Sequence, residues 1–183
     1  MPVAASEIDA ASAGAGDLGY GDDARLFDSA AAAIATILQD KPRIIGFGEF
    51  HKLHSSAPVR SALRRFADDI FDVVGPSTAH LVLETWRMDP SCGKAQVVTR
   101  VVETAIERPK ETEGEMQTLM RKARAFGTAG HVLQFSCEEY GALLKGNTLD
   151  TEALLTTVSA KLGDSATKAL AKTPDDKMVV IYG

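Results

Sequence analysis

Residues 43–54 have the sequence RIIGFGEFHKLH, which joins an apolar run to a group of polar residues. The apolar run combines β-branched residues with glycines, and it predicts a short buried strand over residues 43–50. Glu49, His51 and His54 then lie at or just beyond the carboxyl end of that strand. Whether they form a site depends on what the rest of the chain places beside them.

Three further apolar runs predict strands over residues 80–86, 131–137 and 178–182. Apolar residues at helical spacing fill the intervals between the strands, so the sheet is expected to be mostly parallel, with helices on both of its faces. The sequence therefore predicts one α/β domain over residues 23–183, preceded by a flexible leader over residues 1–22 that is rich in Ala, Gly, Ser and Asp. The predicted helices are 23–39, a segment from Pro58 to the Gly-Pro pair at 75–76, 95–107, 113–126, 138–145 and 150–172.

Composition excludes several classes of function. The net charge of −5 and the absence of a Lys/Arg-rich stripe argue against nucleic-acid binding. No apolar run approaches the roughly 18 residues of a membrane span. The leader lacks the basic start and apolar core of a secretory signal, so the protein is either cytoplasmic or, if a signal was removed, periplasmic or a lipoprotein. The sequence does not determine the oligomeric state.

Familiar catalytic motifs are absent from the sequence. It contains no GxSxG elbow, P-loop, HExxH helix or GxGxxG after a strand. The sequence therefore lacks the motifs that usually identify four classes of enzyme. These are serine hydrolases with that elbow, nucleoside triphosphatases, zincins and dinucleotide-binding enzymes.

The polar residues fall into two groups, those at the carboxyl ends of the predicted strands and those at the amino ends. In an open parallel sheet, ligands bind beyond the carboxyl ends of the strands. Glu84 and Arg87 lie at the carboxyl end of the second predicted strand, on the same expected edge as Glu49. His80 and His131 open their strands at the opposite edge, so the rule removes them from the candidate site.

The Glu-x-His spacing suits hydrolytic chemistry. Glu49 and His51 are two residues apart, so in an extended backbone their side chains point to the same side. An imidazole oriented by a carboxylate can act as a general base on water. The same pair can supply oxygen and nitrogen ligands to a divalent metal. The ordinary alternatives are a solvated loop for this pair, a strand terminator for Glu84 and a surface position for Arg87.

Cys92 and Cys137 are the only cysteines, and both fall on the expected carboxyl edge. Two cysteines are too few for a disulfide-dense scaffold, and neither belongs to a CxxC pair. One disulfide, two free thiols and a contribution to the site all remain open from the sequence.

The sequence resembles one superfamily in the stretch IIGFGEFH, the helix that follows it and the strand sequence LVLETW. That superfamily joins erythromycin-esterase-like proteins, ChaN-like haem-binding lipoproteins and the TraB/TIKI group. Its members share a Gly-Glu-x-His or Gly-x-x-His strand end, followed after one helix by a strand that ends in glutamate. Gly48, Glu49 and His51 match the first motif, and Glu84 matches the second. The resemblance covers residues 43–86, and beyond them only the order of strands and helices.

The resemblance implies one of three functions. The first two are hydrolysis of an ester or peptide bond without a metal, and hydrolysis with a divalent metal held by Glu49 and His51. The third is haem binding without catalysis. An interaction domain with a vestigial pocket is a further alternative. Arg60 is similar to an arginine on the helix of the esterase-like members, and His54, Arg60 and Arg87 are the candidate cofactor-binding residues. The expected partner is a small-molecule substrate or haem.

The sequence departs from the family pattern in three places. Esterase-like members place two residues between Glu and His, where this chain has only Phe50. ChaN-like members have a second histidine cluster after the first motif, for which only His54 is available here. Members also carry a further histidine after the last core strand, and this sequence ends at Gly183, where that motif would begin. The domain is therefore expected to be incomplete after Gly183.

Overall fold

A parallel four-stranded sheet forms the centre of the fold in the computed structural model, which describes residues 25–50, 59–88, 92, 111–145 and 148–183. The strand order is β1-β6-β2-β3, and every neighbouring pair is parallel. A separate antiparallel pair is formed by two short strands. The strands of the main sheet are β1 (Ile44–Gly48), β2 (His80–Met88), β3 (Ala129–Phe135) and β6 (Met178–Tyr182), and the short pair is β4 (Leu144–Lys145) and β5 (Thr148–Leu149).

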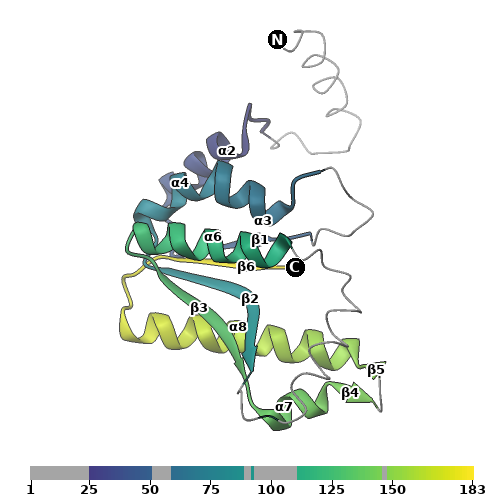
Figure 1. The fold of residues 1–183 in the computed structure, drawn as a ribbon. Coiled ribbons are helices and arrows are strands. Elements are labelled where there is room, and N and C mark those ends of the chain that lie inside the picture. Colours follow the sequence, from purple (N-terminus) through teal and green to yellow (C-terminus); the bar gives the residue numbers. More distant parts are fainter. Residues whose placement is uncertain (1–24, 51–58, 89–91, 93–110, 146–147) are drawn as a thin grey trace.

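Helices cover both faces of the sheet (Figure 1). This confirms the predicted α/β class with a mostly parallel sheet. Among the described residues, no helix is long and apolar enough to cross a membrane. The first face carries α2 (Ala30–Ile37), α3 (Ala62–Arg65), α4 (Phe71–Val74) and α6 (Glu111–Ala125), and the opposite face carries α8 (Thr151–Lys172). The shorter elements are η2 (Leu38–Asp40), the π-helical turn η4 (Phe66–Ile70) between α3 and α4, η5 (Gly75–Ser77) and α7 (Cys137–Ala142) after β3.

Alternating side chains of the central strands supply two separate cores. Leu81 and Leu83 of β2 point to the first face, where they belong to one cluster with Phe71. Val82 lies between them in the sequence and points to the opposite face, where it packs with Ala169 of α8. Because side chains alternate along a strand, a strand covered by helices on both faces needs apolar residues at consecutive positions, as here.

Capping residues set several element boundaries differently from the prediction. β3 ends at Phe135, before the predicted residue 137, because Ser136 is the N-cap of α7. The Ser136 hydroxyl accepts from the N–H of Glu139, and the Glu139 carboxylate accepts from the N–H of Ser136, which together form a capping box. The predicted helix over 138–145 is wrong at its end, since Leu144 belongs to β4.

The first predicted helix is shorter than expected. The described part begins at residue 25, and α2 starts only after Ser29, whose Oγ accepts from the N–H of Ala32. The start of the helix predicted from Pro58 and the predicted helix over 95–107 lie outside the described residues.

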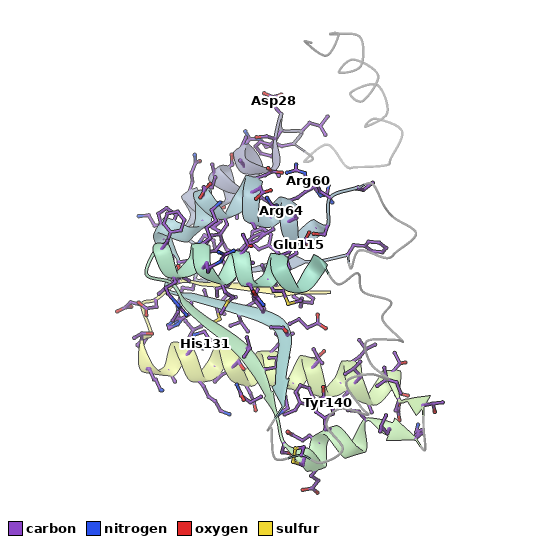
Figure 2. All side chains as sticks on the ribbon, in the orientation of Figure 1. Asp28, Arg60, Arg64, Glu115, His131 and Tyr140 are labelled. Carbon is purple, nitrogen blue, oxygen red and sulfur yellow. A yellow bond between two sulfur atoms is a disulfide. The ribbon has the colours of Figure 1, made fainter. Side chains whose placement is uncertain are left out.

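The two histidines that were excluded from the candidate site, His80 and His131, lie together near the amino edge of the sheet, where Figure 2 labels His131. His80 Nδ1 is 3.1 Å from His131 Nε2. On its other side, His80 Nε2 is 3.0 Å from Thr173 Oγ1 and 3.2 Å from Asp176 Oδ2. One ring nitrogen of the pair must donate and the other accept, which requires at least one neutral imidazole. The cluster ties the starts of β2 and β3 to the turn between α8 and β6.

Acid is expected to destabilise the fold through His131. Burial, and then the neighbouring charges of His80 and Lys172, hold the pKa of His131 below its ordinary value. A folded-state pKa below that of the unfolded chain gives stability that is complete above about pH 6.5 and lost as the pH falls. Urea unfolding at about pH 7.5 and 5.5 should show a larger loss for the wild type than for His131→Gln. Equal losses would contradict the assignment.

Candidate functional site

The end of β6 brings the two predicted carboxylates to one edge of the sheet. Glu49 follows directly after β1, and its N–H donates to the carbonyl oxygen of Tyr182 at 2.6 Å. Glu84 Oε2 accepts from the N–H of Gly183 at 2.5 Å. Because β6 lies between β1 and β2, Glu49 and Glu84 lie on either side of its carboxyl end. This is the edge at which open parallel sheets bind ligands.

Glu84 lies in a bulge of β2 and not at the strand end that was predicted. Pairing of β2 with β6 ends at Leu83, but pairing with β3 continues to Met88. The register with β3 shifts between Leu83 and Trp86, so Glu84 and Thr85 have no counterpart on β3. Figure 1 shows the bend of β2 before its arrowhead. Bulges re-aim side chains and are frequent beside active sites, which makes this position of a carboxylate notable.

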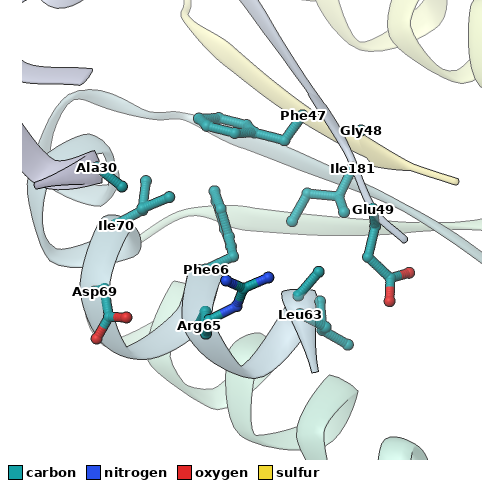
Figure 3. Close-up of a pocket in the computed structure, with 11 residues that line it drawn as sticks. Ala30, Phe47, Gly48, Glu49, Leu63, Arg65, Phe66, Asp69, Ile70 and Ile181 are labelled. Atoms are coloured by element: carbon teal, nitrogen blue, oxygen red, sulfur yellow. The ribbon is translucent and has the colours of Figure 1, made fainter. Parts of the chain in front are cut away.

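A pocket of about 260 Å³ opens beside Glu49 (Figure 3). It lies between the carboxyl end of β1 and the helical segment formed by α3 and η4. Most of its walls are apolar, and charged groups are confined to three positions. The lining residues are Ala30, Phe47, Gly48, Ala62, Leu63, Phe66, Ile70 and Ile181, with Glu49, Arg65 and Asp69 as the charged members.

The helical wall of the pocket contains a π-helical turn. Within η4 the N–H of Phe71 donates to the carbonyl oxygen of Phe66, five residues earlier. Phe66, Asp69 and Ile70 of this turn all line the pocket. The extra residue of a π turn is uncommon inside a helix and is found frequently at functional sites. The sequence predicted an uninterrupted helix here, because no glycine or proline marks the change.

Ion pairs hold most of the charged groups on this wall. Arg60 is exposed, and its guanidinium is 3.1 Å from Asp69 and 3.5 Å from Asp68. Arg64 Nε is 2.6 Å from Asp68, and this hydrogen bond and charge raise the pKa of Arg64 above its ordinary value. Arg60, a predicted cofactor-binding residue, is thereby held at the Asp69 side of the pocket.

A buried serine fixes the amino end of α3, where the helical wall of the pocket begins. Ser61 caps α3, since its Oγ accepts from the N–H of Arg64. The same hydroxyl donates to Glu115 Oε2 of α6 at 2.5 Å. A buried hydroxyl satisfied in both roles anchors the first turn of α3 to α6. The sequence predicts a helix that begins at Pro58 and so gives Ser61 no role, although a serine followed by a helical apolar stripe is the usual signal of a cap.

Three predicted site side chains lie outside the described part of the structure, namely those of His51, His54 and Arg87. The backbone of residue 87 belongs to β2 and pairs with Gln134. Among the described side chains, no group of three His, Cys, Asp or Glu residues is arranged to hold a metal ion.

The two cysteines form a disulfide, which is one of the states that the sequence left open. Their Cα atoms are 5.4 Å apart. The bond joins Cys92, shortly after β2, to Cys137, the first residue of α7, and Figure 2 shows its sulfur atoms beside that helix. It therefore connects the chain beyond the carboxyl ends of two neighbouring strands.

No protein-family model matches the sequence, and no curated protein matches it significantly. A crystal structure of bacterial protein toxins is 21% identical over 85% of this chain and 30% of that chain, with a TM-score of 0.46. The crystal structure of RRSP, a MARTX toxin effector domain from Vibrio vulnificus CMCP6, is 20% identical over 81% of this chain and 29% of that chain, with a TM-score of 0.42. This chain thus spans less than a third of the length of both structures.

Proposed function

We propose that this domain hydrolyses an ester or peptide bond at the carboxyl edge of its sheet, with Glu49, His51 and Glu84 as the catalytic residues. The observation that carries the proposal is the position of two carboxylates on either side of the end of β6. One of them adjoins a pocket and the other lies in a bulge. Such an edge offers a substrate a binding cavity together with groups that can move protons.

Each residue has a distinct role in this proposal. His51 is the general base that takes a proton from water, and Glu49 orients its ring and stabilises the imidazolium. Glu84 is the second carboxylate, on the far side of β6, and supplies a proton to the leaving group. In a metal-dependent version, Glu49 and His51 instead share a divalent ion that activates the water.

The pocket favours a substrate over haem. Sites for drug-sized ligands have volumes of about 300–1,000 Å³, and this pocket of about 260 Å³ suits a substrate group the size of a side chain. Haem binding through His54, Arg60 and Arg87 is the second candidate function. Arg60 already pairs with Asp68 and Asp69, which leaves its guanidinium less available to a haem propionate.

The disulfide supports an oxidising location for this activity. Disulfides persist in secreted proteins and in the bacterial periplasm, and they are rare in the cytosol. The bond between Cys92 and Cys137 therefore favours an envelope or extracellular hydrolase over a cytoplasmic one.

The test combines turnover and spectroscopy on one purified protein. Nitrophenyl esters and fluorogenic peptides are screened with and without EDTA, and haemin is titrated while the Soret band is followed. Turnover that His51→Ala removes, without a saturable Soret shift, supports hydrolysis, and its sensitivity to EDTA identifies the metal-dependent version. A saturable shift that His51→Ala or His54→Ala abolishes, without turnover, would replace hydrolysis by haem binding. Neither signal would indicate an interaction domain.

A further inference from the structure

We propose that the pocket beside Glu49 binds an apolar group that ends in a carboxylate, and that Arg65 selects this negative charge. The inference deepens the proposed function and rests on it, because it names the part of the substrate that the pocket holds.

The apolar walls of the pocket are built into the core. Leu63, Phe66 and Ile181 are 2%, 5% and 4% exposed, and all three belong to the core cluster on the first face of the sheet. Phe47 of β1 packs edge-on against Phe66, with ring centroids 4.7 Å apart. Walls held in this way need little rearrangement to receive a ligand, which lowers the entropic cost of binding.

The volume of the pocket limits the length of the apolar group. A water-sized group occupies about 30 Å³, so about 260 Å³ holds roughly eight such groups. A straight six-carbon carboxylate is close to this size. Longer chains must extend out of the pocket into solvent, where they gain little from burial.

Arg65 is the charged residue of the pocket that is available to pair with a ligand. Within the described part of the chain, none of its nitrogens lies within 4.0 Å of a carboxylate, whereas Arg60 and Arg64 are both paired. Asp69 also lines the pocket, but Arg60 neutralises it at 3.1 Å. The planar guanidinium presents parallel N–H donors that match both oxygens of a carboxylate.

The charges also set the direction in which the ligand lies. Figure 3 shows Arg65 and Glu49 as separate charged groups around the apolar walls. Of the three charged lining residues, Arg65 is the cation and Glu49 and Asp69 are acidic, so the anionic end of a ligand is directed to Arg65. The remainder of a longer substrate then extends past Glu49 along the carboxyl edge, toward Glu84.

Binding is measured without turnover, by NMR chemical-shift titration with hexanoate, hexan-1-ol and hexylamine. We expect hexanoate to bind most tightly. Arg65→Gln should weaken hexanoate binding by about tenfold or more, because a charge-assisted bidentate contact is lost, and it should leave hexan-1-ol binding unchanged. The matched control is Arg64→Gln, which removes the neighbouring arginine that is paired with Asp68 and should change neither affinity.

A second variant tests the position of the ligand. Ala62→Leu fills the pocket from α3 and should weaken binding of hexanoate and hexan-1-ol alike. Equal affinity for the acid and the alcohol, equal effects of Arg64→Gln and Arg65→Gln, or no binding at all would overturn the inference. Hydrolysis by a protein that shows no such preference overturns the inference alone. Selective hexanoate binding without any turnover overturns the proposed hydrolysis and leaves the anion site standing.

Discussion

Replacement of Glu49 by glutamine is expected to lower hydrolytic turnover by roughly 10²–10⁴-fold, which is the range for loss of acid–base assistance. Glutamine keeps the size of the side chain, and the backbone N–H that donates to Tyr182 is unchanged, so the fold should persist. In the proposed mechanism, the change removes the negative charge that orients the ring of His51 and stabilises its cation. The value of kcat/KM on the best substrate of the panel measures the effect, and thermal unfolding reports on the fold.

Glu138 offers a matched control for this charge change. It is an exposed carboxylate in the first turn of α7, just after β3, and Glu138→Gln should leave turnover within about twofold. Residues that act as a unit give non-additive losses, so Glu49→Gln combined with His51→Ala should lose no more than the stronger single variant. Additive losses would contradict the proposed pairing of Glu49 with His51.

The shared edge of the two carboxylates could be predicted because it needs only local information. Apolar runs followed by Glu49 and Glu84 indicate strands, and parallel strands have their carboxyl ends on one edge whatever their order. The order itself is a long-range property. Insertion of β6 between β1 and β2 depends on which strands pair across about a hundred residues or more, and no single stretch of sequence encodes that choice.

The irregular backbone around the site was less predictable. The bulge at Glu84 and Thr85 lies where the pairing of β2 with β6 ends, at Leu83, while its pairing with β3 resumes at Trp86 in a shifted register. The π turn at 66–70 places an extra residue in a helix whose apolar stripe is otherwise regular. Both features come from packing between elements, and neither is marked by glycine or proline.

Removal of the disulfide is expected to lower the free energy of unfolding by about 2–5 kcal/mol. The cysteines are 45 residues apart, for which the chain-entropy relation gives roughly 4 kcal/mol. Urea unfolding of the Cys92→Ser, Cys137→Ser double variant measures the loss. Reduction of the wild type should reproduce it, and the same reductant should leave the double variant unchanged. A loss below about 1 kcal/mol would show that the bond hardly restrains the unfolded chain.

The loss should be concentrated in the part of β2 that lies beyond the bulge. Residues 81–83 pair with β3 on one side and β6 on the other, whereas residues 86–88 pair with β3 alone. The disulfide lies at the end of this singly paired segment, so without it the segment should open more often. Hydrogen exchange should therefore accelerate at residues 86–88 and 133–135 before it does at 81–83 and 179–181. Because Glu84 lies at the junction of the two parts, such opening should also lower turnover, and uniform acceleration along β2 would refute this local role.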